Sequence, residues 1–359
     1  MNMDPVKVID LTRIFTLPTH VSISNFPGTP AGFLTKLYYE YFKKGNRITI
    51  KALDRINLTL RRGEILCLLG PNGSGKTTLL KIIAGLLLPT SGKVLIDGID
   101  ILNLTCEEIA RRVTYIPGLL LGGAWINGFF TLKENLRNYA ELLNLDKGRI
   151  EWALEITGLS EIKNVKAAAL SSGIHARLVL ASGLLKESGI YLMDEPMTGL
   201  SREIVVDLLG YIKNLRKAGS SILYATNSIE EAERIADRVA ILNKGRIMAI
   251  GTPEELVEKI KEEIVEIEVE GINIGVFREN IERALPGESK VRIEPLNYTN
   301  DLLKAYLTTK DSRELLPPLI DRVVKSGGKV RFVKVHKPTL EEVFIKFTKL
   351  SGGGNERKD

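Results

Sequence analysis

The stretch LLGPNGSGKTTLLKIIAG, residues 68–85, decides the fold. The run GEILCLLG at 63–70 is apolar and short, which predicts a buried parallel strand. After the glycines, KTTLLKIIAGLL at 76–87 places apolar residues at helical spacing. The sequence therefore predicts strand, turn and helix in an α/β fold, with a glycine-rich turn at the carboxyl end of the strand.

The turn itself has the spacing G-x-x-x-x-G-K-T over residues 70–77. Glycines in such a loop let backbone N–H groups surround phosphate oxygens, and the helix N-terminus adds positive potential. Lys76 would reach the terminal phosphates, and the Thr77 hydroxyl would ligate Mg²⁺. The sequence predicts a nucleotide phosphate site; the alternative is a glycine turn that caps a helix without a ligand. The predicted binding residues are Gly70, Pro71, Asn72, Gly73, Ser74, Gly75, Lys76, Thr77 and Thr78.

A second group of candidate residues follows another apolar run, GIYLMDEP at 189–196. Two carboxylates, Asp194 and Glu195, end this predicted strand, at the sheet edge where parallel strands place ligands. Asp194 would hold the Mg²⁺ shell through water, and Glu195 would orient or deprotonate an attacking water. A single carboxylate here could simply cap a helix. Two carboxylates in a chain with a phosphate loop favour catalysis.

Composition sets the limits of this interpretation. The chain has 359 residues with 44% hydrophobic content, which is enough for two globular domains. Its longest apolar stretch, IPGLLLGGAWINGFF at 116–130, is broken by Pro and Gly and is shorter than the roughly 20 residues of a membrane-spanning helix. The N-terminus lacks a secretory leader pattern, and Cys67 and Cys106 lack metal-ligand spacing. The net charge of +6 is spread along the chain, so it does not indicate a nucleic-acid partner.

Three motifs in order carry a resemblance to a known family: GPNGSGKTT at 70–78, LSSGIHARLVLASGLL at 170–185 and YLMDEPMTGLS at 191–201. Together they resemble the nucleotide-binding subunit of an ABC transporter, over roughly residues 6–348. The resemblance implies a P-loop NTPase cassette, a mixed sheet with a helical subdomain at about 117–183. It also implies ATP and Mg²⁺ as cofactors, and ATP hydrolysis that drives transport through a separate transmembrane permease. The expected location is the cytoplasmic face of the membrane, through that permease.

The family's dimeric arrangement assigns a role to the second motif. In the resemblance, LSSGI opens a helix and closes over the ATP held by a second copy or by a related cassette. Ser171 and the backbone of Gly173 at a helix N-terminus would suit a γ-phosphate. An isolated LSSG would be only a helix cap.

Three further segments have two possible interpretations each. Phe15, in VIDLTRIF at 8–15, stands where the family places an aromatic residue that stacks on adenine, although it could be a core residue. The basic, aromatic segment AGFLTKLYYEYFKKGNR at 31–47 would lie at the membrane surface, or it would pack as a helix on the sheet. The loop at 118–132, with Trp125 and two phenylalanines, would receive a helix of the permease or fill the subdomain's own core.

Three positions depart from the family. Gly118 stands where Gln is usual, Asn227 where His is usual, and Ser201 where Asp is usual. The chain contains no Gln, so a shift of register cannot restore the first. Asn227 can donate a hydrogen bond to a phosphate but cannot carry charge. We predict secure ATP binding with slow hydrolysis. A regulatory module that dimerises on ATP, or a soluble ABC ATPase outside transport, are the alternatives.

After Thr252 the sequence changes character, so we expect a first domain over 1–252 and an accessory domain over 253–350. The order of predicted elements there is β-α-β-β-α-β, which is ferredoxin-like. EIVEIEVE at 263–270 alternates, and we expect it to be an exposed edge strand. KPTLEEVFIKFTKL at 337–350 resembles the ending of drug-exporter-type ABC ATPases. The tail at 351–359 reads as disordered.

Overall fold

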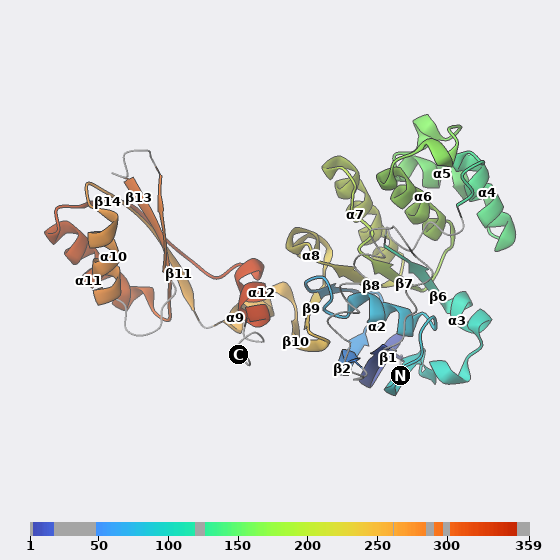
Figure 1. Ribbon diagram of the computed structural model, residues 1–359, viewed down its shortest axis with the longest axis horizontal. Coiled ribbons are helices and arrows are strands. Elements are labelled where there is room, and N and C mark those ends of the chain that lie inside the picture. The colour runs from blue at the N-terminus through green and yellow to red at the C-terminus, as the bar shows by residue number, and fades with distance from the viewer. Residues whose placement is uncertain are drawn as a thin grey trace. The chain divides into compact units, whose positions relative to one another are not determined.

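The computed structural model describes residues 3–17, 48–118, 126–260, 262–284, 291–296 and 302–349 (Figure 1). The chain divides into two compact units, Met1–Ile250 and Gly251–Asp359. The predictions for the basic segment at 31–47, for Trp125 and for the tail at 351–359 lie outside the described residues. Among the helices that are described, none combines the length and the apolar character needed to cross a bilayer.

A six-stranded sheet forms the centre of the first unit, in the order β10-β9-β3-β8-β7-β6. β3 (Ile65–Leu69) pairs in parallel with β8 (Ser221–Thr226) and β9 (Arg238–Asn243). β7 (Ile190–Asp194) pairs in parallel with β8 and with β6 (Val113–Ile116), and β10 (Arg246–Gly251) is an edge strand. All residues of β3 and β7 are buried, which confirms the two predicted buried parallel strands.

The second sheet of this unit is antiparallel, and helix α2 packs with it. Its strands, in the order β2-β1-β4-β5, are β2 (Ile48–Leu60), β1 (Val6–Leu17), β4 (Ser91–Ile96) and β5 (Ile99–Asp100). α2 (Lys76–Ile83) directly follows the glycine-rich turn, as predicted. Side chains of α2, β1 and β3 share one hydrophobic core, so the turn between β3 and α2 is held between the two sheets.

Among the described residues between β6 and β7, three α-helices form a subdomain with a core of its own. They are α4 (Leu132–Leu142), α5 (Ile150–Ile156) and α6 (Ser172–Leu185), and Figure 1 shows them grouped together. α3 (Cys106–Arg112) precedes β6, while α7 (Arg202–Lys217) and α8 (Ile229–Ile235) follow β7 and β8. The mixed sheet with a helical subdomain is the architecture expected for the cassette. Short 3₁₀ turns lie at Ile101–Asn103, Lys147–Arg149, Ser160–Ile162 and Ala167–Ala169.

The second unit confirms the ferredoxin-like order but corrects one strand. Its elements are α9 (Pro253–Glu258), β11 (Glu263–Glu270), α10 (Ile274–Ala284), β12 (Val291–Pro295), β13 (Leu302–Thr309), α11 (Ser312–Lys325), β14 (Lys329–His336) and α12 (Leu340–Lys349). The antiparallel sheet runs β12-β13-β11-β14, and α10 and α11 share a core with one of its faces.

The expectation that 263–270 forms an edge strand is wrong, because β11 lies between β13 and β14. Val265, Ile267 and Val269 are fully buried in the core under the helices. The glutamates between them lie on the other face, where Glu266 and Glu268 pair with Lys304 of β13. Alternation of apolar and polar residues therefore indicates that one face of a strand is buried, but it does not indicate the strand's place in the sheet.

Candidate active site

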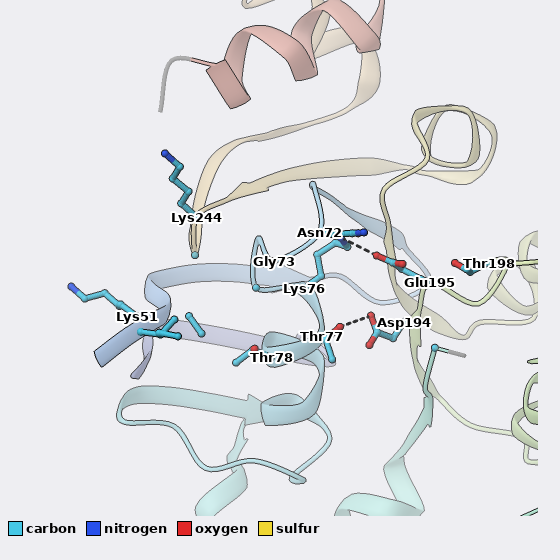
Figure 2. A pocket seen from close by; sticks show the side chains of 15 residues that line it. Lys51, Asn72, Gly73, Lys76, Thr77, Thr78, Asp194, Glu195, Thr198 and Lys244 are labelled. Carbon is cyan, nitrogen blue, oxygen red and sulfur yellow. Dashed lines mark hydrogen bonds and ion pairs between the residues drawn. The ribbon is translucent and has the colours of Figure 1, made fainter. Parts of the chain in front are cut away.

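A cavity of about 850 Å³ lies where β3 and β7 end and α2 begins (Figure 2). The glycine-rich turn, the end of β7, strand β2 and the β9–β10 turn all line it. Its walls carry Ile50, Lys51, Ala52, Asn72, Gly73, Gly75, Lys76, Thr77, Thr78, Gly118, Asp194, Glu195, Thr198, Lys244 and Gly245. The structure thus brings together the phosphate loop and both predicted carboxylates, which are more than a hundred residues apart in the sequence.

Two glycines of the turn are required by its geometry. A Cβ at Gly70 would lie 2.3 Å from the carbonyl oxygen of Leu242. Gly75 has φ 111°, a backbone angle that residues with a side chain rarely adopt, and a Cβ there would lie 2.7 Å from the carbonyl oxygen of Ala52. The turn is therefore pressed against β2 and the β9–β10 region, and its backbone follows a path that only glycine permits. Such a path is what a backbone phosphate cradle needs.

Lys76, the first residue of α2, is buried with an exposed fraction of 4%. Its ammonium group donates to the carbonyl oxygens of Gly70 and Pro71, at 2.8 and 3.3 Å. It also lies 3.1 Å from the Glu195 carboxylate, and Figure 2 shows these two side chains facing one another. These oxygens compensate the burial of the ammonium charge. A cation is thus held at the cradle, where the phosphates of a nucleotide would bring negative charge.

Asp194 is buried and receives hydrogen bonds on both carboxylate oxygens. Thr77 Oγ1 donates to Oδ1 at 3.1 Å, and Tyr115 OH donates to Oδ2 at 3.3 Å. Burial raises the pKa of Asp194, and the nearby Glu195 raises it further; the bonds from Thr77 and Tyr115 and the charge of Lys76 oppose this rise. A cation beside Asp194 would favour the charged carboxylate.

The donor set fits Mg²⁺ bound together with a nucleotide. Thr77 and Asp194 offer a hydroxyl and a carboxylate, which are hard oxygen ligands. In the described part of the chain, no three His, Cys, Asp or Glu residues gather to hold a metal alone. Mg²⁺ commonly takes one or two protein ligands and completes its shell with phosphate oxygens and water. These residues would hold the ion only alongside bound phosphates.

Glu195 has a backbone conformation that the sequence does not indicate. Its φ is 46°, in the left-handed region that costs a residue with a side chain on the order of 1 kcal/mol or more. A hydrogen bond from its N–H to the carbonyl oxygen of Ala225, at 2.9 Å, holds this conformation. The carboxylate consequently turns toward Lys76 and the cavity. Strain of this kind is commonly found at functional sites.

Two of the three departures from the family, Gly118 and Asn227, lie at this cavity or contact a residue that lines it. Asn227 follows β8, and its Nδ2 donates to Asn72 Oδ1 of the glycine-rich turn at 3.3 Å. Gly118 lines the cavity, and a Cβ there would lie 2.9 Å from the carbonyl oxygen of Asp194. Ser201 caps α7 and makes no side-chain capping bond. Because a Cβ at Gly118 would lie so close to Asp194, a longer residue at position 118 would require the backbone near the end of β6 or β7 to move.

Phe15 and the LSSG residues do not line the cavity. Phe15 is half-buried in β1, with the Arg13 guanidinium 4.6 Å from its ring centre. Its cross-strand partner Ile50 does line the cavity, so Phe15 is beside the site. Ser171 is exposed at the N-cap of α6, and its side chain makes no capping hydrogen bond. Roles for Phe15, Ser171 and Gly173 in binding ATP stay predictions.

Several wall residues were missed by sequence reasoning. Lys51 and Ala52 belong to β2, and Lys244 and Gly245 form the β9–β10 turn. Gly245 N donates to Ser74 O and its carbonyl accepts from Asp54 N, which ties this turn to the phosphate loop and to β2. The letters N-K-G-R at 243–246 predict only a hairpin turn. The contact of that turn with the loop depends on strand order, which the motif does not contain.

Comparison with known proteins agrees with this geometry. Residues 53–198 match the family described as ABC transporter. The spermidine/putrescine import ATP-binding protein PotA of Bacillus cereus is 32% identical over 289 residues, 76% of this chain and 86% of that protein. The daunorubicin resistance ATP-binding protein DrrA3 of Streptomyces coeruleorubidus is 30% identical over 304 residues, 83% of this chain and 91% of that protein. A putative ABC transporter ATP-binding protein of Pyrococcus horikoshii is 38% identical over 245 residues, 65% of this chain and 92% of that protein.

Solved structures share the fold. A structure of an ATP-binding subunit of an ABC transporter superposes with a TM-score of 0.54 at 25% identity, over 71% of this chain and 92% of that one. The dimeric structure of MJ0796, a bacterial ABC transporter cassette, superposes with a TM-score of 0.55 at 23% identity, over 69% of this chain and 98% of that one.

Proposed function

Because the chain belongs to the ATP-binding proteins of ABC transporters and is an ATPase of that family, we propose that it hydrolyses Mg²⁺-bound ATP in the cavity and thereby drives export through a separate transmembrane permease. The observation that carries the proposal is the convergence of Lys76, Thr77, Asp194 and Glu195 on one cavity. These four side chains supply the charges and the base that phosphoryl transfer to water requires.

The residues divide the chemistry among themselves. Lys76 would exchange its contacts with the Gly70 and Pro71 carbonyls for contacts with phosphate oxygens. It would also give up its ion pair with Glu195, which leaves the carboxylate free to act on water. Thr77 and Asp194 would hold Mg²⁺, which neutralises developing phosphate charge. Glu195 would then orient the attacking water and accept its proton.

A second cassette completes the proposed site. Ser171 and Gly173, at the N-terminus of α6, would close over ATP bound in the partner cassette, and the adenine would stack on Phe15. Exposure of Ser171 and its freedom from capping support this role. We favour a homodimer, because this chain retains Glu195, which a subunit specialised as the inactive half would be expected to lose.

The direction of transport is the finer part of the proposal. The similarity to DrrA3 over 83% of the chain and the drug-exporter-type ending at 337–350 support export. PotA, which is named for import, has a similar percentage identity to this chain, but the match covers a smaller share of the chain. ATP-driven uptake into inside-out vesicles that contain the chain and its co-purified permease would show export. Uptake into right-side-out vesicles would show import.

A regulatory module with little turnover is the second candidate, and the changes at Gly118, Asn227 and Ser201 favour it. Phosphate release from the purified protein, with and without the co-purified permease, distinguishes the candidates. An ABC exporter subunit releases phosphate faster with the permease. ATP-dependent dimerisation without phosphate release under either condition would support the regulatory module.

We expect Asn227→His to raise the rate of ATP hydrolysis several-fold. Asn227 already lies 3.3 Å from Asn72 of the phosphate loop, so an imidazole there would reach the phosphates and could carry charge. Steady-state phosphate release with the permease present measures the effect, and Asn227→Ala is the matched control that should not accelerate it. A rate for Asn227→His at or below the parent's would show that Asn227 does not limit hydrolysis.

We expect Phe129→Ala to weaken the complex with the permease while changing the melting temperature little. Phe129 is 83% exposed just before α4, so its removal leaves no cavity in the protein. Leu142→Ala is the control, because Leu142 is 82% exposed at the C-terminal end of α4, while Phe129 lies just before its N-terminal end. A pull-down from solubilised membranes measures binding. Equal retention of the permease by parent and Phe129→Ala would contradict this docking surface.

A further inference from the structure

The Asp194 carboxylate is held by two hydroxyl groups that come from different elements. Thr77 belongs to α2, and its hydroxyl donates to Oδ1; Tyr115 belongs to β6, and its hydroxyl donates to Oδ2. β6 pairs in parallel with β7, and Tyr115 lies opposite Leu192, two residues before Asp194. The sheet itself therefore sets the distance between the Tyr115 backbone and the carboxylate.

Packing keeps the Tyr115 ring in place. The ring is half-buried against the main hydrophobic core of the first unit. Neighbouring residues Thr114 and Ile116 are buried as well, so the strand has little freedom to shift. A hydroxyl on a ring fixed in this way restricts the rotation of the carboxylate that it contacts.

Both hydroxyl groups can remain donors when a metal is bound. A threonine hydroxyl that binds a metal through an oxygen lone pair keeps its proton, so Thr77 would still donate to Oδ1 while Tyr115 holds Oδ2. Gly118, three residues further along, lines the cavity but contributes no side chain. Among the described residues of β6 and the two that follow it, Tyr115 is the one whose side chain forms a hydrogen bond with this carboxylate.

We propose that Tyr115 is a positioning residue for the Mg²⁺ site: its hydroxyl holds Oδ2 of Asp194 so that Oδ1 faces Thr77 and the metal. This inference rests on the proposed function, because it requires Mg²⁺ at Thr77 and Asp194. Partners of metal-ligating carboxylates commonly affect metal affinity by roughly 10- to 100-fold when they are removed.

The test is the affinity for Mn²⁺, a spectroscopic substitute for Mg²⁺, in the presence of a non-hydrolysable ATP analogue. Electron paramagnetic resonance reports free Mn²⁺ during the titration. Tyr115→Phe removes one oxygen and keeps the ring, and we expect it to weaken Mn²⁺ binding roughly ten-fold. Binding of the same analogue in EDTA should stay within about two-fold of the parent, because the Tyr115 hydroxyl donates to Asp194 and not to the phosphate loop. Tyr115→Leu also lacks the hydroxyl and replaces the Phe variant if that variant does not fold.

Tyr191→Phe is the matched control. Tyr191 is a buried tyrosine of β7 whose hydroxyl donates to Lys186 O at 2.8 Å and accepts from Ser188 N, away from the cavity. Its loss should lower the melting temperature and leave Mn²⁺ affinity unchanged. Parental Mn²⁺ affinity in Tyr115→Phe, or an equal loss in both variants, would overturn the inference and leave the proposed function standing. A parent protein that binds the analogue without any Mn²⁺ dependence would overturn the inference together with the metal part of the proposed function.

Discussion

Replacing Glu195 by Gln is expected to lower ATP turnover by roughly 10² or more and to leave ATP binding intact. The amide has the shape of the carboxylate but cannot accept the proton of the attacking water. Because an amide also cannot form an ion pair with Lys76, now 3.1 Å from the carboxylate, the lysine is freer to contact phosphate. The variant should therefore bind ATP at least as tightly as the parent.

Two measurements on the same preparations check this result. Phosphate release gives the turnover, and titration with a fluorescent ATP analogue gives the affinity. Glu203→Gln is the control, since Glu203 is an exposed carboxylate in the first turn of α7 and its loss should change neither quantity. Turnover in Glu195→Gln equal to that of the parent would mean that another group is the base.

The sequence predicts those parts of the site whose residues are close together in the chain and have a fixed spacing. The phosphate loop needs glycines at fixed positions between a strand and a helix, so its prediction uses only residues 70–77 and the strand and helix beside them in the sequence. Asp194 and Glu195 are similarly marked by their place at the end of an apolar strand. In each case the neighbours in sequence are also the neighbours in space.

The parts that sequence reasoning misses depend on which strands lie side by side. Tyr115 reaches Asp194 only because β6 pairs with β7, and Gly245 contacts the phosphate loop only because β9 lies beside β3. The left-handed backbone of Glu195 is fixed by a bond to Ala225 of β8. The misplaced edge strand at 263–270 has the same cause, because hydrophobic alternation identifies a buried face and leaves the pairing order open.

Replacing Lys76 by Met is expected to weaken ATP binding about 10²-fold, the scale of one charge-assisted hydrogen bond. Methionine keeps much of the side-chain length and loses the charge. The ammonium group of Lys76 is the partner of two loop carbonyls and of Glu195, so its removal takes away the cation that would face the phosphates. It also leaves the Glu195 carboxylate without this ion pair, directed toward the phosphate site.

This second consequence can be separated from the first with a double variant. If the exposed negative charge contributes to the loss, Lys76→Met combined with Glu195→Gln should bind the ATP analogue more tightly than Lys76→Met alone, although more weakly than Glu195→Gln. Lys81→Met, in the last turn of the same helix, is the control for removing a lysine and should bind like the parent. Equal affinities of Lys76→Met and the double variant would show that Glu195 does not repel the nucleotide. Parental affinity in Lys76→Met would mean that the cradle holds phosphate through its backbone N–H groups alone.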